Sequence, residues 1–307
     1  MKQIIYIIMC VVALSACTKE IDFEFHDEDP VVVIEAKVTN EGRTVIISRS
    51  RPMNDSVHAH CLPGANIVIT GDGNTTVLTY NAASDSYFSP VPGEAGHTYQ
   101  LSVDFEGQHY EASATMPDAA PITSAAFCWV TVLNERMLCY ELWGIDPEPD
   151  TRNYFWLKMH RISHHPHLEG TRQTKPFSSK LMDDRGFPPG KLFADWTIIS
   201  EKAMDDDEED NWKRIPYDGD SIYVTQMTVD RQVFNYLYEL STGQYNGANP
   251  HSNISGGCLG YFAAGSVTHS DTIVFKRADV KEWNLDNIFN ELTGSTSIVD
   301  SNINSIK

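Results

Sequence analysis

Basic side chains are scarce in this sequence, and their scarcity excludes one large class of function. Among 307 residues, 23 are Lys or Arg and 42 are Asp or Glu, which gives a net charge of −19 at pH 7. A field of this sign repels phosphate backbones, so we expect no nucleic-acid partner. It also disfavours flat docking on an anionic lipid surface. The charge suits either plain solubility or the capture of cationic cargo.

Catalytic signatures are also missing. The sequence contains no Gly-x-Ser-x-Gly elbow, no His-Glu-x-x-His pair and no glycine loop of the phosphate- or dinucleotide-binding kind. Carboxylates are numerous, but they are scattered over many segments and single out no acid/base pair. We therefore expect no enzyme, no catalytic residue and no cofactor, and a hydrolase ranks last among the functions considered.

Long apolar runs are limited to one segment near the start of the chain. Lys2 precedes an apolar run over residues 4–14, which is shorter than the roughly 20 residues that a spanning helix needs. Leu14-Ser15-Ala16-Cys17 follows, with small residues before a cysteine, as in a bacterial lipobox. We predict a lipoprotein signal peptide over residues 1–16 and a diacylglyceryl group on Cys17. An ordinary secretory signal is the alternative.

Either signal takes the mature chain out of the cytoplasm, and acylation would anchor it to a membrane without spanning it. Residues 17–30 are polar and acidic and are predicted to form a tether. Lys19-Glu20 resembles a basic-then-acidic surface-export signal, and a generic solvated linker is the alternative.

Short strands separated by turn signals begin at residue 31. Residues 98–105 alternate strictly between polar and apolar side chains, which is the period of a half-buried strand. Asp72-Gly73 and Glu106-Gly107 are typical of two-residue hairpin turns, because glycine accepts positive φ. These signals predict an antiparallel, Ig-like sandwich over residues 31–117. Its expected strands cover residues 31–38, 44–50, 65–70, 75–80, 87–89, 98–105 and 108–116.

Proline-rich residues 117–121 indicate a domain boundary. Beyond it we predict a second, β-rich domain over residues 118–282 and a C-terminal tail over residues 283–307. One helix is expected over residues 228–240, with Thr228 as its N-cap and Gly243 just past its end. Residues 164–217 are expected to be irregular except at 192–199. The other predicted strands cover residues 122–133, 137–145, 153–162, 221–227, 261–267 and 272–275.

Cysteine is used sparingly. Of six cysteines, Cys10 would leave with the signal peptide and Cys17 would be lipidated. Cys128 and Cys139 lie on two predicted strands on either side of Asn134-Glu135, so they would face each other across a hairpin. A disulfide between them and a pair of free buried thiols both stay open at this point. The other two cysteines are Cys61 and Cys258.

Histidine forms two local clusters, and imidazole is a ligand for Zn, Cu, Fe and Ni. One cluster places His58 and His60 beside Cys61. The other is a candidate metal site whose spacing fits no closed zinc template. Accidental density of exposed loop histidines is the alternative. The second cluster consists of His160, His164, His165 and His167.

Two further groups of residues have ordinary explanations. Six consecutive acidic residues at 205–210 lack the alternating spacing of a calcium loop and are expected to be solvated. Aromatic residues crowd the first strands of the second domain, where core packing is the default and a recognition surface the alternative. These aromatics are Trp129, Tyr140, Trp143, Tyr154, Phe155 and Trp156.

Several segments, in order and spacing, resemble one family of Bacteroidota lipoproteins, catalogued as domain of unknown function 4249. The resemblance extends to about residue 275 and leaves the tail after Trp283 unmatched. Cys258 stands where the resemblance leads us to expect a small residue such as alanine. The matching segments are residues 17–22, 32–36, 63–69, 96–103, 146–147, 152–155 and 259–262.

The resemblance implies an outer-membrane lipoprotein of unknown biochemical activity, of a kind that often accompanies a TonB-dependent receptor. It also implies a first domain similar to the carboxypeptidase-regulatory or transthyretin-like sandwich. We therefore expect a lipid-anchored protein that faces the cell exterior and captures small-molecule or peptide cargo for such a receptor in nutrient uptake. The alternative is a surface adhesin or structural interaction protein.

Overall fold

The computed structural model describes residues 29–51, 59–166, 177–204, 215–246 and 249–283, with the side chains of residues 244–246 left out. All the elements below belong to one compact unit, which comprises residues 31–50 and the described residues from 59 onward. The fold is mainly β, as predicted. In the described ranges, no helix combines the length and apolarity that a bilayer crossing requires.

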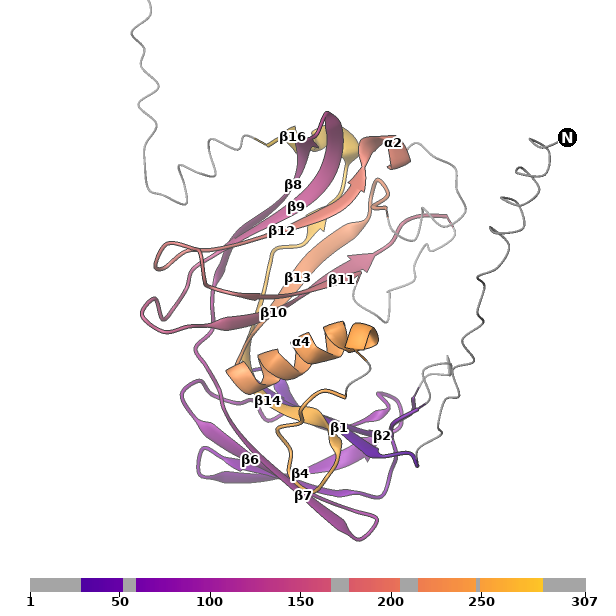
Figure 1. Cartoon of the computed structure of the whole chain (residues 1–307), viewed down its shortest axis with the longest axis vertical. Coiled ribbons are helices and arrows are strands. Elements are labelled where there is room, and N and C mark those ends of the chain that lie inside the picture. The colour runs from indigo at the N-terminus through magenta and orange to yellow at the C-terminus, as the bar shows by residue number, and fades with distance from the viewer. Residues whose placement is uncertain (1–28, 52–58, 167–176, 205–214, 247–248, 284–307) are drawn as a thin grey trace, which may run out of the picture. The chain divides into compact units, whose positions relative to one another are not determined.

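The first seven strands lie where the sequence predicted them (Figure 1). Both predicted hairpin turns are confirmed: Asp72 and Gly73 have φ of 55° and 72°, and Glu106 and Gly107 have φ of 50° and 78°. The strands are β1 (Val32–Thr39), β2 (Gly42–Arg49), β3 (Asn66–Gly71), β4 (Asn74–Asn81), β5 (Ser86–Ser89), β6 (Thr98–Phe105) and β7 (Gln108–Thr115).

These strands enclose one core, because alternate side chains along each strand point inward. β1 buries Ile34, Ala36 and Val38, and β6 buries Tyr99 and Leu101 among others. In hydrogen-bonding order, β1, β2 and β5 lead through β4 to β3, β6 and β7. β4 pairs with both β3 and β5 and thereby joins the two halves of the sandwich.

The second half contains two strand layers and one long helix. Its strands are β8 (Ile122–Val132), β9 (Glu135–Gly144), β10 (Tyr154–Ile162), β11 (Ser178–Asp183), β12 (Leu192–Ser200), β13 (Ser221–Val229), β14 (Leu259–His269), β15 (Ile273–Val274) and β16 (Lys281–Glu282). Its helical elements are α2 (Glu201–Met204), α4 (Arg231–Asn246) and the 3-10 turn η1 (Arg277–Asp279).

Three details of the second half correct the expectations. β11 was not predicted; it pairs with β10. The helix begins at Arg231, and its N-cap is Asp230, whose carboxylate accepts the Val233 amide at 2.9 Å. Thr228, the expected cap, instead lies buried in β13. The helix also continues past Gly243 to Asn246.

A small sheet in the order β12, β9, β8, β16 packs on the larger sheet through one face. Tyr140 and Trp196 from the small sheet meet Phe155 and Leu157 of β10 in a second core. The opposite face of β10 and its neighbours packs against α4, through residues such as Leu237. β10 and β13 therefore lie in a sheet that is covered by the small sheet on one side and partly by α4 on the other.

β14 joins the N-terminal sandwich to the second half. Its residues 259–265 pair in parallel with β1, and its residues 266–269 pair antiparallel with β13. Two asparagine side chains extend this ladder: Asn40 bonds both backbone groups of Val267, and Asn253 bonds both of Phe262. β14 is therefore shared by the two domains that the sequence predicted.

The pairing of β14 with β1 predicts the effect of two matched glycine substitutions. Gly260 has φ of +106°, and a Cβ there would lie 2.0 Å from the carbonyl oxygen of Ile34. Gly257 has φ of +83°, but no atom lies within 4 Å of its Cβ position. Gly257→Ala should cost about 1 kcal/mol of unfolding free energy for backbone strain alone. Gly260→Ala should cost about 3 kcal/mol or more, because the backbones must separate.

Urea unfolding of the two variants measures this difference. Equal losses at Gly257 and Gly260 would contradict the close approach of β14 to β1.

Candidate functional site

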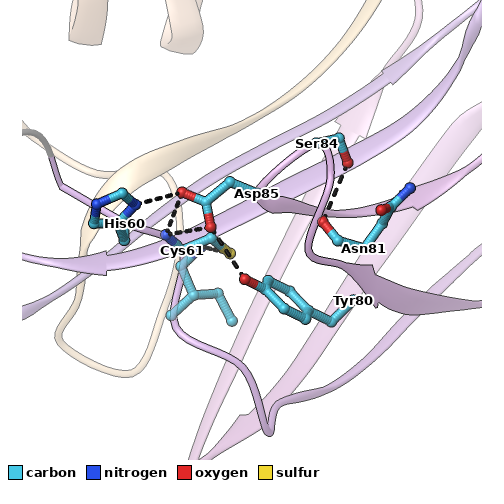
Figure 2. A network of polar contacts seen from close by, with 7 residues as sticks. His60, Cys61, Tyr80, Asn81, Ser84 and Asp85 are labelled. Carbon is cyan, nitrogen blue, oxygen red and sulfur yellow. Dashed lines mark hydrogen bonds and ion pairs between the residues drawn. The ribbon is translucent and has the colours of Figure 1, made fainter.

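His60 and Cys61 of the first histidine cluster take part in a network of polar contacts around Asp85. The carboxylate of Asp85 accepts the backbone amide of Cys61 at 3.2 Å and the hydroxyl of Tyr80 at 3.1 Å, and lies 3.1 Å from Nδ1 of His60 (Figure 2). The amide of Cys61, followed by His60, holds the pKa of Asp85 below its usual range. The network joins the segment before β3 to the turn between β4 and β5. His58 lies outside the described residues.

The environment of the Cys61 thiol is unsuited to metal binding. It is buried in the core of the N-terminal sandwich, and the Ile47 amide donates to its sulfur at 3.5 Å. Burial raises the pKa of Cys61, so the thiol stays protonated at neutral pH. A protonated, buried sulfur binds metal poorly, and Cys61 is best understood as core.

Three members of the second histidine cluster lie in the described part of the chain. His160 lies on β10 and stacks on Tyr223 with 4.8 Å between ring centroids. The loop after β10 carries His164, whose amide donates to the buried Asp220, and His165, whose ring meets Tyr217. The described ranges contain no group of three or more His, Cys, Asp or Glu residues placed to hold a metal ion. His167 falls outside them, so the four-histidine site stays a prediction.

The outer face of the small sheet is the strongest candidate for a site. Alternation along β9 sends Tyr140 and Leu142 into the core and leaves Glu141 and Trp143 on the other face. The same alternation places the half-buried Phe193 of β12 on this face. This outer face has no second sheet packed on it among the described elements.

Three aromatic rings form one wall on this face. Trp143 and Phe193 lie 4.5 Å apart between centroids, and Phe193 stacks on Trp283 at 6.1 Å. The Trp283 indole donates to the carboxylate of Glu141 at 2.7 Å, and its backbone amide donates to the carbonyl of Trp129 at 2.8 Å. Trp283 is therefore held onto the face by two hydrogen bonds and one stacking contact.

The floor beside Trp283 holds the two predicted partner cysteines. Cys128 and Cys139 are directly opposite each other on β8 and β9, as the hairpin geometry predicted. The turn lies one residue earlier than expected, at Leu133-Asn134. Both thiols are free and no disulfide joins them. The Cys139 thiol lies 3.8 Å from the Thr197 hydroxyl.

The chemistry of these thiols follows from their burial. Burial raises the pKa of Cys128 to about 12 and raises that of Cys139 as well. A thiolate is the reactive form of cysteine, so neither residue is suited to be a nucleophile at neutral pH. The pair forms an apolar floor, together with Val130.

Two adjoining cavities, of about 550 Å³ and about 460 Å³, open at this face, and the larger one extends past the edge of β8 to residues 273–283. Both are lined by Cys128, Glu141 and Trp283, so we treat them as one groove. Glu141 and Asp195 lie directly opposite each other on β9 and β12. Each has a separate donor: Trp283 for Glu141, and Lys180 at 3.2 Å for Asp195. The groove thus combines aromatic walls with hydrogen-bond acceptors, which suits binding a small ligand.

The hairpin between β8 and β9 presents an apolar tip at one end of the groove. Leu133 is 96% exposed and Val132 is 51% exposed, and both line the smaller cavity. Leu133 has φ of 51°, a conformation that costs a non-glycine residue roughly 1–2 kcal/mol. The tip is therefore a small exposed apolar surface beside the groove.

Sequence reasoning missed this groove, although part of the signal was visible. Trp143 belongs to the aromatic group that was assigned to the core by default. Its outward orientation follows from alternation along β9, because its neighbour Leu142 points into the core. Phe193 was overlooked because β12 was treated only as an ordered piece of an irregular region. Trp283 was assigned to the tail, and nothing local connects it with Glu141.

Comparisons with known proteins identify the family and add no function. The profile of the family described as "Domain of unknown function (DUF4249)" matches residues 18–271, and the chain belongs to this family. No curated protein matches the chain significantly. Among solved structures, a selenomethionine-substituted chicken interferon gamma receptor alpha chain matches at 8% identity, covering 65% of this chain and 89% of that one. Its TM-score is 0.16, so the likeness carries no argument.

The free thiols predict the outcome of a titration. In denaturant without reductant, a form of the protein that begins after Cys17 should show four free thiols with Ellman's reagent, at Cys61, Cys128, Cys139 and Cys258. The native protein should react far more slowly at pH 8, since burial keeps these thiols protonated and inaccessible. A count of two in denaturant would contradict the free pair at Cys128 and Cys139.

Proposed function

From the chain's membership of the DUF4249 family and the geometry of the groove, we propose that this protein is an outer-membrane lipoprotein that captures cargo for a TonB-dependent receptor. The observation that carries the proposal is the aromatic groove on the outer face of the small sheet, with the apolar hairpin tip at its end. The proposal needs no catalysis by this chain: it binds a ligand, and the receptor supplies transport.

The anchor part of the proposal rests on the lipobox that ends at Cys17. An acylated Cys17 would confine the protein to the membrane plane, and the tether over residues 17–30 would let its body reach a neighbouring receptor. Confinement raises the effective concentration of one protein near another, so even a modest contact surface would suffice. The net charge of −19 supports a body held away from anionic lipid.

The capture part of the proposal rests on the chemistry of the groove. The Trp143 and Trp283 indoles offer flat apolar surfaces, and Glu141 offers acceptor oxygens beside them. This combination suits a small ligand with one flat apolar face and with hydroxyl or amine donors. Leu133 at the tip would contact the receptor, because it is apolar, strained and almost fully exposed.

Affinity purification tests the receptor partnership. Full-length tagged protein, extracted from its own cells in mild detergent, should recover a β-barrel receptor. Leu133→Asn should recover at least about tenfold less receptor, because the apolar contact is lost. The same change should leave the fold intact or stabilise it, because Asn tolerates positive φ better than Leu. Loss of binding in a variant of undiminished stability would therefore report on the contact itself.

A matched pair of aromatic variants tests the groove. Small molecules that copurify with the wild type, identified by mass spectrometry, should be lost from Trp143→Ala and retained by Tyr238→Ala, which removes an exposed aromatic from α4. Recovery of no β-barrel receptor and no groove-dependent ligand would overturn the proposal. Cell binding that persists without the receptor would favour the adhesin.

A further inference from the structure

A second constellation lies on the face of the large sheet that α4 partly covers. Lys37 of β1 and Lys158 of β10 converge on the indole of Trp156: their Nζ atoms lie 5.4 Å and 3.6 Å from its ring centroid. Tyr261 of β14 meets the same indole edge-on at 6.2 Å. Two ammonium groups from separate strands are thus gathered around one aromatic ring, and all three side chains are half-buried.

Neither ammonium group has a hydrogen bond or an ion pair in the described part of the chain. This is unusual in a protein with 42 acidic residues and 23 basic ones. Lys180, which also lies over an indole, pairs with Asp195 at 3.2 Å. The arginines Arg136, Arg152 and Arg185 all have carboxylate partners. Other lysines that have no partner among the described residues, such as Lys276 and Lys281, are exposed.

Holding two half-buried cations together without a directly paired anion is costly. Burial, and then the charge of Lys37, lowers the pKa of Lys158 to about 7. Burial also lowers the pKa of Lys37. Glu35 raises both pKa values, but less than burial lowers them. A bound anion would relieve this cost, because opposite charge favours the charged form of both amines.

We propose that Lys37, Lys158 and Trp156 form a binding site for an oxyanion group, either a sulfate or phosphate ester or a carboxylate, carried by a small ligand. The two ammonium groups supply the charge, and the indole fixes their positions. The site is separate from the groove, because it lies on the large sheet and shares no residue with the groove lining.

Binding at this site should depend on pH. Below pH 7 both amines are charged and attract an oxyanion, whereas above it Lys158 loses its proton. Of the other titratable groups on this face, only Glu35 acts on the two amines. These groups are Glu35 on β1, His160 on β10, Tyr223 on β13, Tyr261 and His269 on β14, and Tyr236 on α4.

Calorimetry with sulfate and with acetate tests the proposal, because neither anion changes charge between pH 6 and pH 8.5. The full chain should bind at least one of them saturably, about tenfold more tightly at pH 6 than at pH 8.5. Tighter binding of sulfate would indicate a sulfate or phosphate ester on the ligand, and tighter binding of acetate would indicate a carboxylate. Lys158→Met should weaken binding at least about tenfold, since it keeps the apolar stem and removes the charge.

Lys180→Met is the matched control, because Lys180 also lies over an indole, that of Trp196, but pairs with Asp195. This variant should bind the anion as tightly as the wild type does. Binding to the wild type at pH 7 in two buffers of different ionisation enthalpy should reveal proton uptake, a readout that requires no variant. No saturable heat with either anion up to about 50 mM would overturn the site. Equal affinity in the wild type and Lys158→Met would overturn it too.

Discussion

The pairing of β14 with two different strands is the constraint on which the rest of the described fold depends. Its first residues lie parallel to β1 and its last residues antiparallel to β13, so one strand crosses from the N-terminal sandwich into the second half. Its two faces serve different cores: Phe262 packs with the sandwich, and Tyr261 packs under α4. Gly260 permits the closest approach, where its backbone meets that of Ile34.

Both candidate sites follow from how the sheets are covered. The small sheet uses Tyr140 and its neighbours to pack against β10 and β13, which leaves the outward residues of β8, β9 and β12 for the groove. On the large sheet, α4 covers only part of the opposite face, and Trp156 with its two lysines lies beside the covered part. The two predicted aromatics that are only half-buried, Trp143 and Trp156, therefore mark the two sites.

The N-terminal strands could be predicted from the sequence, because alternation of polar and apolar side chains and the glycines of tight turns are visible within a few consecutive residues. The start of the helix was misplaced because Thr228 and Asp230 are both good caps, and only packing commits Thr228 to β13. β11 escaped notice because it buries no residue fully. The groove and the lysine pair join residues distant in sequence, such as Glu141 with Trp283 and Lys37 with Lys158, and no local pattern reports such contacts.

Native-state hydrogen exchange across β1, β13 and β14 tests most directly whether β14 unites the two halves. If it does, the slowest amides of all three strands exchange through the same global unfolding, with one free energy and one dependence on denaturant. The N-terminal sandwich would then lose protection together with β10 and β13. Protection that persists in β1–β7 after β13 has become exposed would show that the halves unfold separately, and would contradict the account.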